Sequence, residues 1–166
     1  MIKDDARTFT GPISRDRQKK TDEVFTPIHI VDHMIDMVSD VDNLGVTMFE
    51  PAAGDGNFVV RVIERKIKKA GVTRSNAIQA VSDVYACEYM RDNWEAIIAR
   101  IGALLAELNL TSDWQTDEIR DIALNNIAYC NTIDHTDISE GRKYPDWLLE
   151  ARGIAKQNSL ENLFDI

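Results

Sequence analysis

A loop with two closely spaced glycines follows the first strand-like run of the sequence. Residues 46–50 include β-branched and aromatic residues, and residues 51–56 read PAAGDG. Two glycines two positions apart let the backbone turn tightly and approach a ligand without a Cβ in the way. A helix that starts after Gly56 offers free N–H groups, which favour a carboxylate or a phosphate. A plain turn between a strand and a helix explains the same glycines, so both interpretations stay open.

The glycines of this loop fit neither of two common nucleotide-binding motifs. The dinucleotide fingerprint G-x-G-x-x-G requires a third glycine at the position that Val59 occupies. A P-loop requires a lysine and then a serine or threonine after its glycines, and no such pair follows here. The loop therefore predicts a ligand other than a pyrophosphate or a triphosphate.

Polar residues also end the two later strand-like runs. Glu88 closes the run at residues 83–88, and Asn131 closes the run at residues 127–131. A carboxylate in this place can accept hydrogen bonds from both hydroxyls of a ribose. An amide can bond an adenine edge, and Tyr89 can pack on an adenine face. Each residue also has an ordinary alternative: an exposed acid for Glu88, turn chemistry for Asn131 and core packing for Tyr89.

Apolar spacing predicts the elements that would bring these residues together. Strands are expected at residues 46–50, 83–88 and 127–131. Helices are expected from Asn57 to a stop at Gly71, and then at residues 91–108, 118–125 and 145–157. This alternation predicts an α/β fold, a parallel sheet with helices on both faces, in which ligands bind beyond the carboxyl ends of the strands.

An earlier helix is predicted to begin with Thr26 as its N-cap and Pro27 at its first helical position. Apolar residues follow at helical spacing, which predicts that one face of this helix is buried. That face would consist of Ile30, Val31, Met34, Ile35 and Val38.

The 166-residue chain has a net charge of −9, which affects how it would meet DNA. Tight DNA binding depends largely on Lys and Arg side chains that neutralise phosphates, so an acidic domain is a poor stand-alone DNA binder. We expect residues 1–22 to form a flexible basic arm and residues 23–166 to form one domain. The arm is either a solvated leader or a contact for nucleic acid, and its basic residues are Arg7, Arg15, Arg17, Lys19 and Lys20.

The cysteines and histidines do not form a metal-binding pattern. Cys87 and Cys130 each lie in an apolar run, so they are predicted to be reduced thiols of the core. His29 and His33 are four residues apart, but no third ligand or HExxH signature joins them. The sequence shows no secretory signal and no run apolar enough for a membrane span, so a cytoplasmic protein without a metal is expected.

Four stretches, taken in order, resemble the amino-methylating, adenine-specific DNA methyltransferases. They are FTP at residues 25–27, EPAAGDGNF at residues 50–58, the acid Glu88, and YCNT at residues 129–132. The resemblance covers residues 23–134, and EPAAGDGNF is its specific part. It implies a partial Rossmann-like methyltransferase fold with S-adenosylmethionine as cofactor. It also implies a bacterial or phage-infected cell, because restriction–modification systems use these enzymes.

The resemblance implies a role for each matching residue. Phe25, Thr26 and Pro27 would line the methionine end of S-adenosylmethionine. Glu88 would hold the ribose, Tyr89 follows it, and Asn131 would lie near the adenine. The cofactor loop would consist of Glu50, Ala52, Gly54 and Gly56, with Asn57 and Phe58 beside it.

The catalytic motif of this family, an Asn or Asp followed by two prolines and an aromatic residue, is not found in this sequence. In the family, that motif holds the target amine while its ring stacks on the flipped base. The nearest stretch, YPDW at residues 144–147, reads instead as a helix start whose Trp147 packs on the core. No residues are left for the later strands or for a target-recognition domain. We therefore expect an open edge on the first strand, covered by a partner, a second copy or the C-terminal helix.

The sequence thus predicts the S-adenosylmethionine-binding part of a truncated DNA adenine methyltransferase that is inactive or weak without a partner. The partner would be a catalytic or specificity subunit, or a second copy, and DNA would be reached through it. A split gene with a neighbouring catalytic half fits the same prediction. Two alternatives stay open: a non-catalytic cofactor-binding or regulatory module, and another enzyme that uses S-adenosylmethionine.

Overall fold

The fold is built on a small parallel sheet, seen in a computed structural model that describes residues 25–154. Its strands are β1 (Met48–Glu50), β2 (Val84–Glu88) and β3 (Ile127–Tyr129), in the order β1-β2-β3. Phe49 pairs with Tyr85, and Cys87 pairs with Ala128. The carboxyl ends of the strands therefore meet at one end of the sheet, as the α/β pattern predicts.

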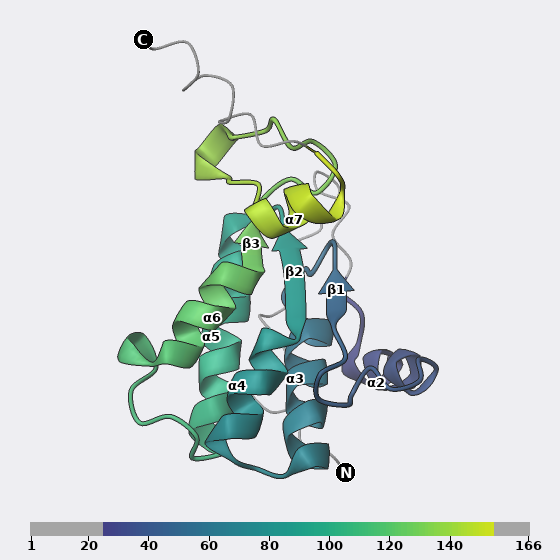
Figure 1. The fold of residues 1–166 in the computed structure, drawn as a ribbon, viewed down its shortest axis with the longest axis vertical. Helices are drawn as coiled ribbons and strands as arrows, with labels where there is room; N and C mark the ends of the chain where they lie inside the picture. Colours follow the sequence, from purple (N-terminus) through teal and green to yellow (C-terminus); the bar gives the residue numbers. More distant parts are fainter. Residues whose placement is uncertain (1–24, 155–166) are drawn as a thin grey trace.

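Helices precede and follow each strand (Figure 1). The sheet stands above a group of four helices, α7 crosses near the carboxyl ends of the strands, and α2 lies to one side. The helices are α2 (Ile28–Asp36), α3 (Asn57–Ala70), α4 (Arg74–Ser82), α5 (Arg91–Glu107), α6 (Glu118–Asn126) and α7 (Asp146–Ala151), with the 3₁₀ turns η1 (Trp114–Thr116) and η2 (Ser139–Gly141).

The two faces of the sheet are covered unequally. Val84, Ala86 and Ile127 share one face and belong to the main apolar core, which α3, α4, α5 and α6 complete. Cys87 and Ala128 point to the other face, where they form a small cluster with Tyr144 and Leu148. The second face therefore receives only the short helix α7 and the segment before it, among residues 25–154.

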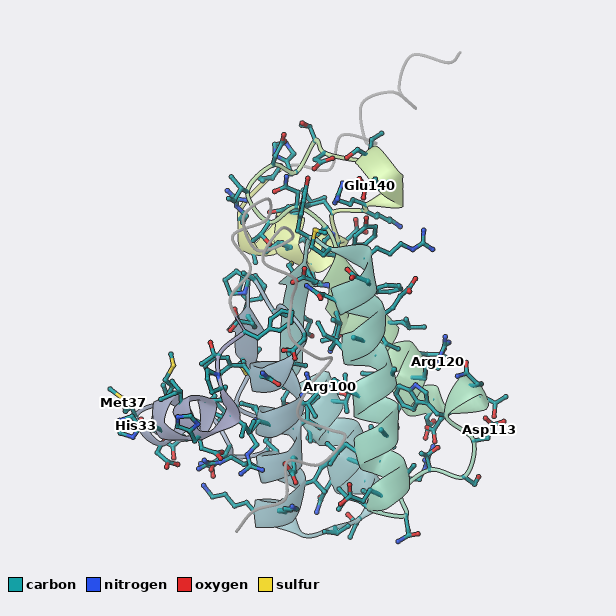
Figure 2. The ribbon with its side chains drawn as sticks, turned by 180° about the vertical axis from the view of Figure 1, so that it is seen from behind. His33, Met37, Arg100, Asp113, Arg120 and Glu140 are labelled. Atoms are coloured by element: carbon teal, nitrogen blue, oxygen red, sulfur yellow. The ribbon has the colours of Figure 1, made fainter. Side chains whose placement is uncertain are left out.

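The first helix is a correction to the sequence prediction. It begins at Ile28 with Pro27 as its N-cap residue, rather than with Thr26 as N-cap. Only Val31 and Ile35 are buried, because α2 lies at the rim and packs mainly on α3. The other residues of the predicted apolar face are exposed: Ile30 by 40%, Met34 by 45% and Val38 by 57%. In Figure 2 the side chains of His33 and Met37 project outward from this helix.

Helix α4 was not predicted from the sequence. Its buried side chains are Ala77, Ala80 and Val81, so small residues carry its contacts and its apolar pattern is weak. The N-cap is a regular one, since the Thr73 hydroxyl accepts a hydrogen bond from the Asn76 N–H at 3.2 Å. The longer helix at residues 91–108 and the short helix at residues 118–125 were predicted within one residue of α5 and α6.

Strand β1 starts later than predicted because a buried lysine ties down the residues before it. Lys66 of α3 is 0% exposed, and its ammonium donates to the carbonyls of Asn43 and, at 2.7 Å, Val46. It also lies 3.3 Å from the Asp83 carboxylate, which accepts from the Gly45 N–H at 2.7 Å. Lys66 of α3 and Asp83, the C-cap residue of α4, therefore hold the residues before Met48. Hydrogen bonds of the strand ladder begin only at Met48.

Two further elements, β3 and α7, are shorter in the structure than the sequence predicted. Strand β3 stops at Tyr129, short of the predicted Asn131, and α7 occupies only Asp146–Ala151 of the predicted helix at residues 145–157. The part of that prediction beyond residue 154, and the predicted arm of residues 1–22, lie outside the described residues. Within residues 25–154, no helix is both long enough and apolar enough to cross a membrane.

We expect Gly56→Ala to destabilise the fold by about 3 kcal/mol. Gly56 has a φ of 88°, and an added Cβ would lie 2.7 Å from Cγ1 of Ile97, so backbone strain and overpacking add together. Chemical denaturation measures the free energy of unfolding.

The matched control is Gly45→Ala. Gly45 has a similar φ of 81°, but an added Cβ meets nothing within 4 Å. This variant should lose only the strain contribution, about 1 kcal/mol. Equal losses in the two variants would contradict the contact between Gly56 and α5.

Candidate functional site

The Glu88 carboxylate joins the ends of two strands. Its Oε2 accepts a hydrogen bond from the Gly54 N–H at 2.7 Å, and its Oε1 accepts one from the Met90 N–H at 2.7 Å. The Asn93 amide of α5 donates to Oε1 at 3.4 Å. Glu88 is only 6% exposed, so these charge-assisted bonds form in a largely dry setting. We call this arrangement the Glu88 hub.

The glycine loop lies against the end of β2. The Ala53 N–H donates to the Cys87 carbonyl at 2.9 Å, and the Gly56 N–H donates to the Ala53 carbonyl at 2.9 Å. Gly54 has a positive φ of 56°, and an added Cβ would lie 3.3 Å from the Phe25 ring. An added Cβ at residue 54 would make a tight contact with Phe25, and at residue 56 it would overlap Ile97, 2.7 Å away.

The segment at residues 25–27 lies beside this loop. Phe25 contacts the position of Gly54, and the Asn57 amide donates to the Thr26 carbonyl at 3.0 Å. Pro27 is exposed and leads into α2. Residues from three distant parts of the chain, at 25–27, 50–58 and 88–90, thus gather at the carboxyl ends of β1 and β2.

A buried ion pair between Arg100 of α5 and Asp55 of the loop was not predicted from the sequence. The Arg100 guanidinium donates to the Asn57 side-chain oxygen at 2.8 Å and to the Asp55 carbonyl. Its Nη1 also lies 3.2 Å from the Asp55 carboxylate. Figure 2 shows Arg100 in the interior between the helices. One signal was present: Arg100 follows Ile97 by three residues and precedes Leu104 by four, so it shares the buried stripe of α5.

Asp55 is a buried acid in the loop before α3, where an anionic ligand was expected. Burial raises the pKa of the Asp55 carboxyl, while the Arg100 guanidinium and then the Asn57 N–H lower it in part. Asp55 precedes the first residue of α3 by two positions, so the protein places an acid of its own close to this helix N-terminus.

Glu50 and its neighbours in the loop are more accessible. The Ala52 N–H donates to Glu50 Oε1 at 3.2 Å, and burial raises the pKa of the Glu50 carboxyl against the lowering effect of that bond. Ala52 is exposed and Phe58 is half-buried. Phe58 belongs to α3 and packs against the main core, and Gly56 and Asn57 are buried.

Tyr89 stacks on an arginine that the sequence analysis did not single out. The Arg142 guanidinium lies 3.8 Å from the centre of the Tyr89 ring, and its Nε donates to the Tyr89 carbonyl at 3.2 Å. Arg142 is buried, but 48% of Tyr89 stays exposed. Tyr89 is therefore not a core tyrosine, and it keeps surface on which a flat ligand can pack.

Asn131 closes a turn after β3. Its amide oxygen accepts from the N–H groups of Ile133 and Asp134, both at 3.1 Å. Its amide nitrogen donates to the Asp137 carboxylate at 3.0 Å. These bonds are the turn chemistry that was the alternative to an adenine contact.

The YPDW stretch is a helix start, as its alternative interpretation predicts. Pro145 is the N-cap residue of α7, and Asp146 lies in its first turn. Trp147 makes edge-to-face contacts with Tyr85 at 5.0 Å and Phe49 at 5.8 Å between ring centroids. Its ring is therefore used in packing α7 on the second face of the sheet.

Cys87 belongs to β2 and Cys130 follows β3, whereas His29 and His33 belong to α2. Cys87 and Cys130 are buried free thiols, and their mutual interaction lowers the pKa of Cys87 and raises that of Cys130. His29 and His33 are exposed on α2. Among residues 25–154, no group of three or more His, Cys, Asp or Glu side chains is placed to hold a metal ion.

Comparisons with known proteins leave the family of this chain open. No protein-family model, no curated protein and no solved structure matches it. The arrangement of the site residues is therefore the basis for a functional proposal.

We expect Glu88→Gln to destabilise the fold by about 1–3 kcal/mol, because an amide can accept only one of the two backbone N–H bonds in this geometry. The control is Glu50→Gln, the same chemical change at the same end of the sheet. Glu50 accepts one long bond and its burial already disfavours the charge, so this variant should stay within about 0.5 kcal/mol of the wild type. Similar stabilities of the two variants in urea unfolding would refute the structural role of the Glu88 hub.

Proposed function

We propose that this chain binds S-adenosylmethionine as the cofactor-binding part of a DNA adenine methyltransferase. The observation that carries the proposal is the Glu88 hub. It joins an acid at the end of β2 to the glycine loop after β1, through the 2.7 Å bond from Gly54. Segment 25–27 lies at the same place. On this proposal the sheet is the first part of a Rossmann-like methyltransferase fold.

Glu88 suits the ribose of the cofactor. Its Oε2 accepts one backbone N–H bond, and its Oε1 accepts one backbone N–H bond and one bond from the Asn93 amide. On this proposal a ribose hydroxyl competes with the bond from Asn93, which is the longest of the three at 3.4 Å. The backbone bonds also fix the carboxylate in place and favour its ionised form, so a ribose would meet an oriented acceptor.

The methionine end of the cofactor is assigned to segment 25–27 and not to the start of α3. Asp55 already supplies an acid there, and a second carboxylate would be repelled. Phe25 offers an apolar wall against Gly54, and Thr26, half-buried, offers a hydroxyl. The sequence had instead suggested that the free N–H groups at the start of α3 bind the carboxylate of a ligand.

The adenine is assigned to Tyr89. The ring is half exposed and its position is fixed by Arg142, so it presents a firm surface next to the ribose acid. We give Asn131 a turn-closing role, because its amide is engaged with Asp137 and with two backbone N–H groups.

A partner is part of the proposal because the family's catalytic motif is missing. The YPDW stretch caps and packs α7, which leaves it no means to hold a target base. The net charge of −9 also disfavours direct DNA binding. We therefore propose that a catalytic or specificity subunit, or a second copy, completes the enzyme in the cytoplasm of a bacterial or phage-infected cell.

A second candidate is a cofactor-binding or regulatory module without catalysis. The use of Trp147 in packing favours it, because the residue nearest to a catalytic aromatic serves the core instead. Another S-adenosylmethionine-using enzyme is the third candidate. This enzyme would either degrade the cofactor or methylate a small molecule. Product analysis after incubation with the cofactor alone detects the degrading version, since only that enzyme changes the cofactor without a methyl acceptor.

We expect calorimetric titration to detect S-adenosylmethionine binding in the micromolar range. Glu88→Ala should weaken it by about 2–4 kcal/mol, roughly 30-fold to 1,000-fold in Kd, from two lost charge-assisted bonds. Asn131→Ala should leave Kd within about threefold, because its amide serves the turn. Circular dichroism establishes that each variant is folded. Equal affinity of folded Glu88→Ala and wild type would remove Glu88 from the binding site.

We expect the purified chain to transfer no methyl group to duplex DNA when it is incubated with radiolabelled S-adenosylmethionine. The reason is chemical: no group of the described site is placed to hold a target amine. Incorporation of label into adenine by the chain alone would refute the need for a partner, although it would support cofactor binding.

A further inference from the structure

The second face of the sheet carries an apolar groove away from the Glu88 hub. The groove has a volume of about 710 Å³ and lies between the sheet and α7. Its walls include Phe49 and Tyr85 of the sheet, Trp147 and Arg152 of the α7 segment, and the turn residues Thr132 and Ile133. Among these, Phe49 is 44% exposed and Ile133 is 89% exposed.

The groove adjoins an open strand edge. The Met48 N–H donates to the Asp83 carbonyl at 2.9 Å, so Met48 faces β2. Because residues alternate along a parallel ladder, the N–H and C=O of Phe49 face away from β2, and β1 has no further strand beside it within residues 25–154. Exposed apolar side chains next to an open edge favour association with another segment.

We propose that residues 155–166 of this chain dock in the groove and cover the second face of the sheet. The described chain ends at Ile154, two residues after Arg152, which is itself a wall of the groove. The segment therefore starts at the rim of its docking site. A short tether gives an effective concentration of about millimolar, so a modest contact suffices.

The sequence of the segment matches the groove in apolar pattern and in charge. Leu160, Leu163 and Phe164 have the spacing of one helical face, which would present three large side chains to the aromatic walls. Glu161 and Asp165 supply acidic groups, and Arg152 supplies a cation at the rim. Fully extended, the segment spans up to about 40 Å, so reach does not limit the docking.

Site-specific photo-crosslinking tests the docking directly in the full-length protein. With p-benzoylphenylalanine in place of Leu163, illumination should give an intramolecular crosslink to peptides that contain Phe49, Tyr85 or Trp147. The product should run as a monomer at all protein concentrations. A crosslinked dimer would show that a second copy fills the groove, and crosslinks confined to other surfaces would place the segment elsewhere; either result overturns the proposal.

A pair of tail variants measures the contribution of the contact. Leu163→Ser with Phe164→Ser should lower Tm by about 4 °C or more and increase the fluorescence of an apolar dye, because the groove becomes uncovered. Lys156→Ser with Gln157→Ser, which keeps the apolar residues, should leave both readings unchanged. If the variant with Leu163→Ser and Phe164→Ser keeps the wild-type Tm and dye fluorescence, the proposal is overturned. Neither variant touches the Glu88 hub, so S-adenosylmethionine affinity reports on the proposed function separately.

Discussion

The bonds from Gly54 and Met90 to the Glu88 carboxylate hold the carboxyl end of this sheet together. Glu88 ends β2, Gly54 belongs to the loop after β1, and Met90 is the N-cap residue of α5. One side chain therefore sets the position of a loop and of a helix start. A buried acid is costly unless it is bonded, so the two N–H groups and the carboxylate depend on each other. An acid that is fixed in this way is also an oriented acceptor for a diol.

The other side of the loop depends on a second buried polar group. Arg100 reaches from α5 to Asp55 and Asn57, and Asn57 in turn holds the Thr26 carbonyl. Segment 25–27, the glycine loop and α5 are thus linked through hydrogen bonds, while Phe25 and Ile97 close around the two glycines. The positive φ of both glycines and the Ile97 contact at Gly56 therefore favour glycine in this loop, whatever its role toward a ligand.

The sequence predicted the carboxyl ends of β1 and β2 correctly but placed the end of β3 two residues too late, and its failures have physical causes. Glu88 and the glycine loop were placed together because parallel strands end at one edge. Helix α4 was missed because alanines make most of its contacts, and the face of α2 was wrong because the helix packs at the rim on one neighbour. Arg100 was missed as a site residue because composition alone does not show which charge in an apolar stripe finds an acid. Asn131 fitted two chemistries equally well in the sequence, and in the structure its side chain makes turn contacts with Ile133, Asp134 and Asp137.

Residue-resolved amide spectra, recorded while S-adenosylmethionine is added to the isotope-labelled protein, test the central claim most directly. If Glu88 holds the ribose, the amide signals of Gly54 and Met90, which donate to its two oxygens, should shift in a saturable way together with Tyr89. Phe49 and Trp147, in the groove on the other face, should keep their signals. Unchanged signals of Gly54 and Met90 at saturating cofactor would contradict the account, and so would shifts confined to the groove.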